Sequence, residues 1–385
     1  MTGALLPQPG NNANLISKLI PYLREKGEVH ILAPAFGETE LPETVFGVPV
    51  HWATDTKRDF KRSFVYPAIS KLRDKGGYSD ALYETILLRE LESVRESFDF
   101  DAVLSTSEPF FAASASARIE NAKKLLYIMD PPECVLGGKG TPFRNRSLGR
   151  ILKKQDAIFT TPFIREALSE NTYGEYDCKI TSVGFPMIEE HQRGKTQVIN
   201  TQNGKIDLLF CGWLYSDIRS PEYFLDIVSR LDERFCVYFM GRECEKLRKR
   251  FSFETKAEIV TLPQQPYQAA IDAMLDADIL INIGNSIPVH MPSKTLEYIN
   301  TGKPIVNFHK LPDCPTRYYT DRYPKCLNIF EGDGDIDEAA ARFIEFCLDN
   351  KGKTVEREYI LREYSDCTPR YIAQKIRDIL GEENE

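Results

Sequence analysis

The stretch Ile279–Phe308, ILINIGNSIPVHMPSKTLEYINTGKPIVNF, contains the signals for a strand, a loop, a helix and a second strand. The apolar run Ile279–Ile283 is short and rich in β-branched residues, which predicts a buried strand. A helix is predicted to begin after Ser293, the expected N-cap, and to end at Gly302, which suits the left-handed closing position. Ile305–Phe308 is the next predicted strand. In open α/β sheets, ligands bind at the loop that follows such a strand.

Three polar residues fall at the start of this predicted helix: Ser293, Lys294 and Glu297. A helix N-terminus carries free N–H groups and a partial positive charge, and both favour phosphate. The lysine adds a point charge, and the carboxylate can accept hydrogen bonds from two neighbouring sugar hydroxyls. The pattern fits a nucleotide-diphosphate-sugar site. It fits equally a plain helix cap with a solvated charged face, and this stretch alone does not decide between them.

The composition indicates a soluble protein of two domains, because 385 residues exceed one ordinary core. No apolar run approaches the ~18–20 residues that span a bilayer, and no secretory signal pattern is present. A net charge of −8 argues against nucleic acid as a partner. The nine cysteines show no C-x-x-C spacing, which predicts reduced thiols and a cytoplasmic location.

Strand and helix signals alternate regularly in both halves of the chain, which predicts an α/β protein with doubly wound parallel sheets. Residues 1–190 form the first predicted domain, and the polar, aperiodic segment 189–205 forms the linker. Residues 205–365 form the second domain. Residues 366–385 are a predicted C-terminal helix with an apolar stripe, which we expect to pack back toward the first domain.

The N-terminus departs from the expected pattern. A Rossmann-like domain begins with a buried strand and a glycine-containing turn. The turn around Gly10 and Asn11 is present, but only Met1–Leu6 precede it. We therefore expect a short first strand, part of which has been lost by truncation or by a misplaced start codon.

Two segments of the first domain are basic. Residues 57–75 contain seven lysines and arginines with interleaved aromatic residues, and residues 139–154 contain six and no acid. In the second segment Leu148, Ile151 and Leu152 recur at helical spacing. Such segments can rest on an anionic membrane, which would place the protein at the inner face of the plasma membrane. A solvated basic face explains them equally well.

Three segments carry a resemblance to a known family. They are FCGWLYSDIRSPEYFLDIV at 210–228, MGRE at 240–243, and DADILINIGNS with MPSKTLEYINTGKPIV within 276–306. Together they resemble the donor-binding domain of GT-B glycosyltransferases, most closely the family-4-like retaining enzymes that build bacterial surface polysaccharides. The resemblance covers most of 205–310, and extends more loosely to the first domain.

The resemblance implies two Rossmann-like domains that face each other across a cleft. It implies a hexosyltransferase-type enzyme that moves a sugar, with retention, from a nucleotide-diphosphate sugar to a glycan or polyprenyl-linked acceptor. Glu297 would hold the ribose hydroxyls, Arg219 and Lys294 would stabilise the diphosphate, and Asp130 would be the catalytic residue on the acceptor side. The expected donor-binding residues are Gly10, Asn11, Gly212, Ser293, Lys294 and Glu297. His290 joins them as a replacement for a polar contact that the family has and this loop lacks.

The sequence departs from the family pattern at three places. The family often has a second glutamate eight positions before the ribose-binding one, where this chain has Val289. It often has a basic residue directly after the glycine that ends the second domain's first strand, where this chain has Trp213. It often has a histidine near the end of an acceptor-side strand, where this chain has Met129-Asp130.

No cofactor or metal is expected. Asp99-Phe100-Asp101 has the spacing of a metal motif, but it precedes a predicted strand and fits a turn better. Gly10 lacks the companion glycines of a dinucleotide-binding loop. Two alternatives remain open: a sugar-nucleotide epimerase of the same architecture, and a non-catalytic sugar-nucleotide-binding partner subunit.

Overall fold

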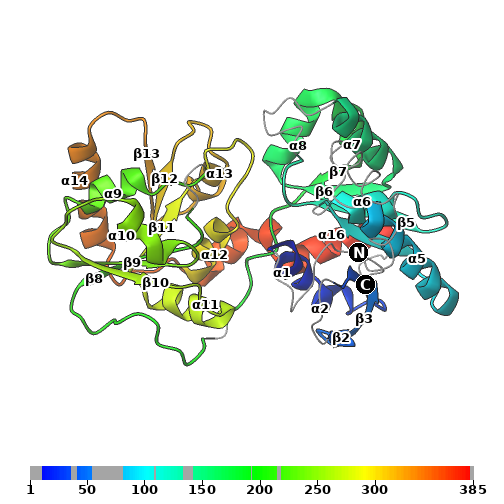
Figure 1. The fold of residues 1–385 in the computed structure, drawn as a ribbon, viewed down its shortest axis with the longest axis horizontal. Helices are drawn as coiled ribbons and strands as arrows, with labels where there is room; N and C mark the ends of the chain where they lie inside the picture. The colour runs from blue at the N-terminus through cyan, green and yellow to red at the C-terminus, as the bar shows by residue number, and fades with distance from the viewer. Residues whose placement is uncertain are drawn as a thin grey trace. The chain divides into compact units, whose positions relative to one another are not determined.

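Figure 1 shows the computed structural model, which describes residues 11–35, 41–53, 81–107, 110–132, 142–191, 193–214 and 218–381. The chain divides into two compact units. Unit 1 consists of residues 1–186 together with 366–385, and unit 2 of residues 187–365. The chain therefore crosses between the units twice, after Pro186 and after Ser365.

Unit 2 contains a parallel sheet in the order β10-β9-β8-β11-β12-β13. Its strands are β8 (Ile206–Cys211), β9 (Phe235–Met240), β10 (Glu258–Leu262), β11 (Ile279–Ile283), β12 (Ile305–His309) and β13 (Cys326–Phe330). Strands covered on both faces need continuous apolar runs, such as FCVYFM in β9. The first strand, β8, lies inside the sheet, and the strand order reverses between β8 and β11. This is the topological switch point of the sheet.

The helices of unit 2 cover both faces of this sheet. The connections β8-β9-β10 and β11-β12-β13 are right-handed and run toward opposite edges of the sheet, so their helices lie on opposite faces. One face carries α9 (Glu222–Val228), α10 (Leu247–Arg250) and α14 (Ile336–Asn350) around an aromatic core. There the ring of Phe308 lies 5.2 Å from Phe224 and 6.1 Å from Phe343. The remaining helices are α11 (Tyr267–Asp276), α12 (Lys294–Thr301), α13 (Pro315–Thr320) and α15 (Arg357–Glu363).

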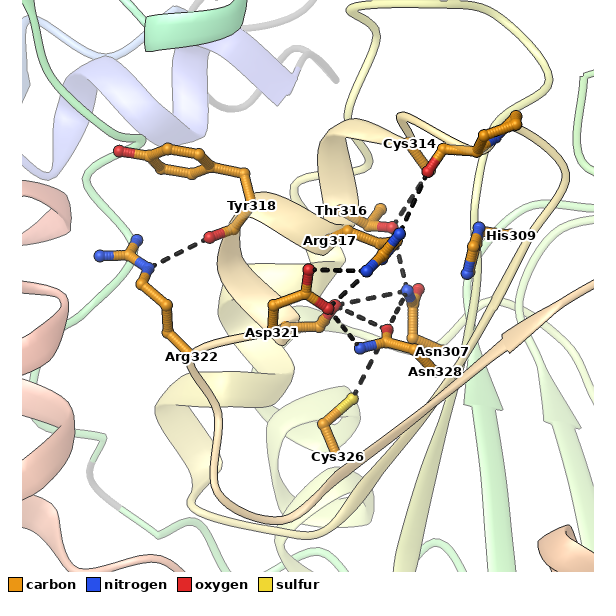
Figure 2. A network of polar contacts seen from close by, with 12 residues as sticks. Asn307, His309, Cys314, Thr316, Arg317, Tyr318, Asp321, Arg322, Cys326 and Asn328 are labelled. Carbon is orange, nitrogen blue, oxygen red and sulfur yellow. Dashed lines mark hydrogen bonds and ion pairs between the residues drawn. The ribbon is translucent and has the colours of Figure 1, made fainter.

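A row of amides crosses the sheet beneath α12 and α13; Asn282 and Asn307 are buried and Asn328 is half-buried. Asn282, Asn307 and Asn328 are register neighbours on β11, β12 and β13. Asn282 Nδ2 donates to Asn307 Oδ1 at 2.7 Å. Asn307 Nδ2 donates to Asn328 Oδ1 at 2.8 Å, and Figure 2 labels these two residues. Asn307 also donates to the Thr316 hydroxyl on α13 at 3.1 Å, and the Thr295 hydroxyl on α12 donates to Asn282 at 3.4 Å. The row therefore ties the first turns of two helices to the sheet.

The described residues of unit 1 form two sheets. One has the order β1-β3-β2, with β1 (Ile31–Pro34) parallel to β3 (Val48–Ala53) and β2 (Thr44–Val45) antiparallel to it. The other is parallel, in the order β4 (Ala102–Thr106), β5 (Lys123–Ile128), β6 (Ala157–Thr160) and β7 (Ile180–Ser182). The helices are α1 (Asn11–Ser17), α2 (Ile20–Leu23), α5 (Ala81–Ser97), α6 (Phe110–Ser116), α7 (Pro142–Lys154) and α8 (Pro162–Leu168).

The last helix, α16 (Pro369–Leu380), belongs to unit 1 and packs on α2. Arg377 Nη1 donates to the Tyr22 carbonyl oxygen at 2.6 Å. The backbone N–H of Gly184 donates to the Asp366 carbonyl at 2.9 Å. This bond joins the two chain segments near the points where the chain leaves and re-enters unit 1.

Two expectations from the sequence are wrong. Leu148, Ile151 and Leu152 on α7 are buried in unit 1, so they cannot form a membrane-facing stripe. The charged segment from Glu243 to Arg250 is predicted from the sequence alone to be one helix. The structure interrupts it, because Glu243 has a φ of +68° and a 3-10 turn precedes the short α10. Three other expectations, on the first strand within Met1–Leu6, on Gly10 and on 57–75, lie outside the described residues. Within the described ranges, no helix is long and apolar enough to cross a membrane.

A buried carboxyl lies directly after β13. The side chain of Glu331 is 12% exposed, and it pairs with Lys310 at 3.7 Å. Burial raises the pKa of Glu331 from 4.5 to about 7, and Lys310 offsets only part of this effect.

We predict that Asn307→Ala lowers the free energy of unfolding by about 3 kcal/mol or more, because the amides and hydroxyls around Asn307 lose their shared partner. Urea denaturation measures this. Asn350→Ala is the control, since among the described residues that amide bonds only to the Phe346 carbonyl, near a helix end, at 2.9 Å. We expect a loss below about 1 kcal/mol for it. Equal losses in the two variants would show that the amide row is not a stabilising network.

We predict that Glu331 makes stability fall as pH rises. Between pH 4.5 and about 7 the folded chain keeps a proton on Glu331 that the unfolded chain releases. The free energy of unfolding then decreases by up to about 3 kcal/mol across this window and stays level above it. Urea denaturation at several pH values should show the decrease in the wild type and lose it in Glu331→Gln. Glu345→Gln, an exposed change on α14, should follow the wild type. An identical pH profile for wild type and Glu331→Gln would contradict the prediction.

Candidate functional site

The candidate site lies at the switch point of the unit 2 sheet, where β8 and β11 separate. β8 pairs with β9 as far as Cys211, but it pairs with β11 only through Leu208 and Leu209. The Tyr298 hydroxyl of α12 takes the place of the missing strand neighbour. It accepts a hydrogen bond from Cys211 N at 2.8 Å and donates to Cys211 O at 3.1 Å. Burial raises the pKa of Tyr298, so the hydroxyl keeps the proton that it donates.

Helix α12 begins at this opening. Ser293 is its N-cap residue and Gly302 closes it with a φ of +76°, which confirms both expectations from the sequence. The Ser293 hydroxyl makes no capping hydrogen bond, and the N-cap carbonyl accepts from Leu296 N at 3.1 Å. The first turn is therefore closed by backbone bonds.

Lys294 and Glu297 form an ion pair on this first turn, with Glu297 buried and Lys294 partly exposed. Burial opposes the charge of the Lys294 ammonium, but the Glu297 carboxylate outweighs that effect and raises the pKa of Lys294. Lysine has three donors, so the ammonium can hold the carboxylate and still donate to a phosphate oxygen. The pair presents a charged donor and carboxylate acceptors at the same opening.

Arg219 connects the two sides of the opening. Its Nε and Nη2 donate to Asn285 Oδ1, at 3.1 and 2.9 Å, and its Nη1 donates to the Trp213 carbonyl at 3.4 Å. Asn285 follows β11, and its Nδ2 donates to the His290 carbonyl at 2.9 Å. Sequence reasoning missed Asn285, although a polar residue directly after a buried strand and a glycine was a usable signal.

The structure brings six of the predicted site residues to this edge of the sheet: Gly212, Arg219, His290, Ser293, Lys294 and Glu297. Gly212 follows β8, and a Cβ there would lie 3.6 Å from Arg219 Nη1. His290 contributes its carbonyl oxygen, which holds the loop after β11. Asp130, after β5, and Asn11, the first residue of α1, belong to unit 1. The roles of all these residues stay predictions.

Helix α12 is also held at its far end. Asn300 Nδ2 donates to the Glu189 carbonyl at 2.9 Å, and its Oδ1 accepts from Glu189 N at 3.2 Å. Arg357 Nη1 donates to the same Oδ1 at 2.7 Å. Glu189 lies three residues past the first crossing between the units, which follows Pro186. The helix that carries Lys294 and Glu297 is thus fixed to the segment by which the chain enters unit 2.

The described part of the chain contains no group of three or more His, Cys, Asp or Glu side chains that could hold a metal ion. Its cysteines are all free thiols. The polar groups at the opening are therefore cations, amides, hydroxyls and a single paired carboxylate, a set suited to an anionic and hydroxyl-rich ligand.

Several solved structures are similar to this chain along its whole length. The lipopolysaccharide outer core galactosyltransferase WaaB, in its apo form, shares 11% identity at a TM-score of 0.61, over 99% of this chain and 98% of its own. The UDP-forming alpha,alpha-trehalose-phosphate synthase from Burkholderia xenovorans, in complex with glucose-6-phosphate, shares 11% at 0.66, over 99% of both chains. HepE from Anabaena, in complex with UDP, shares 12% at 0.61, over 99% of this chain and 98% of its own.

No protein-family model and no curated protein matches the sequence. The likeness therefore rests on structure, and at such identities it shows the fold. This chain has the GT-B fold, with two α/β units built on parallel sheets.

Proposed function

We propose that this chain is a glycosyltransferase that moves a sugar from a nucleotide-diphosphate sugar to a hydroxyl of a glycan or polyprenyl-linked acceptor. The observation that carries the proposal is the Lys294–Glu297 pair on the first turn of α12, at the switch point of a GT-B sheet. Ligands of open α/β sheets bind at this point. Two of the similar structures are complexes with UDP and with glucose-6-phosphate, which supports a donor of this kind and a sugar acceptor.

The chemistry of the donor explains why cations are needed. When the glycosyl–phosphate bond breaks, negative charge develops on the departing diphosphate. Arg219 and Lys294 would stabilise it, and loss of one such contact costs about 3–4 kcal/mol by analogy with an oxyanion donor. Arg219 is held in place by Asn285 before any ligand arrives, so little reorganisation is required.

Glu297 would hold the donor's ribose. Its carboxylate is buried beside Lys294, and it can accept hydrogen bonds from two adjacent hydroxyls. The acceptor would bind to unit 1 with Asp130 on that side, and transfer would proceed with retention in surface polysaccharide synthesis. These details follow from the sequence resemblance.

One observation keeps a non-catalytic role as the second candidate. Val289 stands where the resembled family has a second glutamate, and its φ is +56°. A subunit of that kind would bind nucleotide sugars without transfer to any acceptor. An epimerase would convert the sugar or release nucleoside diphosphate without an acceptor. Incubation with a panel of nucleotide sugars, with and without glycan and polyprenyl-phosphate acceptors, separates the three.

We predict that Lys294→Met lowers kcat/KM for the donor about 10²–10³-fold, because the developing phosphate charge loses a cation. Glu297→Gln should mainly raise the KM for the donor, since the ribose contact is made in the ground state too. Lys246→Met is the matched control, because Lys246 forms a similar i,i+3 pair with Glu243 at 2.9 Å but its side chain is 61% exposed. Equal losses for Lys246→Met and Lys294→Met, or full activity of Lys294→Met, would contradict the assignment.

We also predict metal-independent transfer, because Arg219 and Lys294 supply the positive charge. Donor turnover should be the same after treatment with EDTA and after addition of Mn²⁺ or Mg²⁺. Loss of turnover in EDTA that Mn²⁺ restores would overturn this prediction.

A further inference from the structure

The loops that follow β8 and β9 approach each other closely. Gly241 has a φ of +133°, and a Cβ at this position would lie 2.1 Å from the Gly212 carbonyl oxygen, so only glycine fits. Leu214 N donates to the Arg242 carbonyl at 3.4 Å. The residues that follow the two glycines, Trp213 and Arg242, are therefore neighbours.

Arg242 stacks on Trp213. Its guanidinium carbon lies 4.2 Å from the centroid of the indole ring, a cation–π distance, and indole is the strongest aromatic partner for a cation. Trp213 is 36% exposed and Arg242 is exposed. Within the described residues no carboxylate pairs with Arg242. In contrast, Arg234 at the other end of the same strand pairs with Asp232 at 2.7 Å. The stacked guanidinium keeps its donors for a ligand.

The net positive charge of the residues at the opening is smaller than the negative charge of a diphosphate. Glu297 offsets the charge of Lys294, so the pair is neutral as a whole and Arg219 supplies the net positive charge. The diphosphate of a nucleotide sugar carries two negative charges. Trp213 links the two arginines, because its carbonyl accepts from Arg219 Nη1 at 3.4 Å while its ring supports Arg242.

We propose that Arg242, held on the indole of Trp213, is the second net cation for the donor's diphosphate. This inference rests on the proposed function. Arginine suits the role because its planar fork binds phosphate oxygens in pairs and stacks on aromatic rings at the same time. Trp213 follows β8 at the position where the resembled family often has a basic residue. It then acts as a positioning residue that holds Arg242 in place.

Calorimetric titration of the full chain with UDP, GDP, ADP and dTDP tests both proposals separately. If the wild type binds none of the four, the proposed function fails. With the nucleotide that binds, we expect Arg242→Ala to weaken affinity at least tenfold and to reduce its dependence on ionic strength. Arg242→Lys should lose less, because it keeps the charge. Arg234→Ala, directly before β9, is the matched control and should bind as the wild type.

Trp213→Ala should weaken affinity for the nucleoside diphosphate as much as Arg242→Ala does. The double variant should lose little more, because both changes remove the same contact, one by deleting Arg242 and the other by deleting its support. The corresponding nucleoside, which lacks phosphates, should bind all folded variants equally, and thermal unfolding checks that they fold. Wild-type affinity of Arg242→Ala for the nucleoside diphosphate would overturn the inference. An equal loss for nucleoside and nucleoside diphosphate would also overturn it, since Arg242 would then contact the base or ribose.

Discussion

The candidate site depends on the hydroxyl of Tyr298, which makes the hydrogen bonds to β8 that a neighbouring strand would otherwise make. β8 and β11 part after two register pairs, and the backbone N–H and carbonyl of Cys211 would otherwise lack a partner in the interior. A buried backbone group without a hydrogen bond costs about 1–3 kcal/mol. One phenol satisfies both groups, so the sheet can open at the switch point without that cost. The same side chain fixes α12 to the end of β8, one residue before Gly212.

The position of α12 is specified along its length. Thr295 bonds to the amide row beneath it, Tyr298 to the end of β8, and Asn300 to the chain segment that enters unit 2. The amide row itself extends to α13 and to the surface pair of Arg317 and Asp321, as Figure 2 shows. Lys294 and Glu297 are thus carried by a helix whose rotation and shift are both restricted. Such preorganisation is what electrostatic stabilisation of a departing phosphate requires.

The buried strands of unit 2 could be predicted from the sequence, because strands covered on both faces are mostly apolar along their length. Ile279–Ile283 is observed with the predicted bounds for this reason. Contacts between distant residues could not be predicted in this way. Nothing in the sequence distinguishes Asn300 from an ordinary polar residue of a helix, and its partner Glu189 lies 111 residues away. The interruption before α10 could not be predicted either, because Glu243 adopts a left-handed conformation that glutamate rarely takes.

The loop after β11 shows how a strained backbone can be kept. Val289 has a φ of +56°, a conformation that costs a β-branched residue about 1–2 kcal/mol or more. The neighbouring His290 carbonyl accepts from Asn285, whose Oδ1 accepts in turn from Arg219. One amide therefore restrains the strained loop and the cation together. A ligand that binds Arg219 competes with Asn285 for its donors or adds to their contact. Because Asn285 also holds the His290 carbonyl, ligand binding at Arg219 and the conformation of the loop after β11 are coupled.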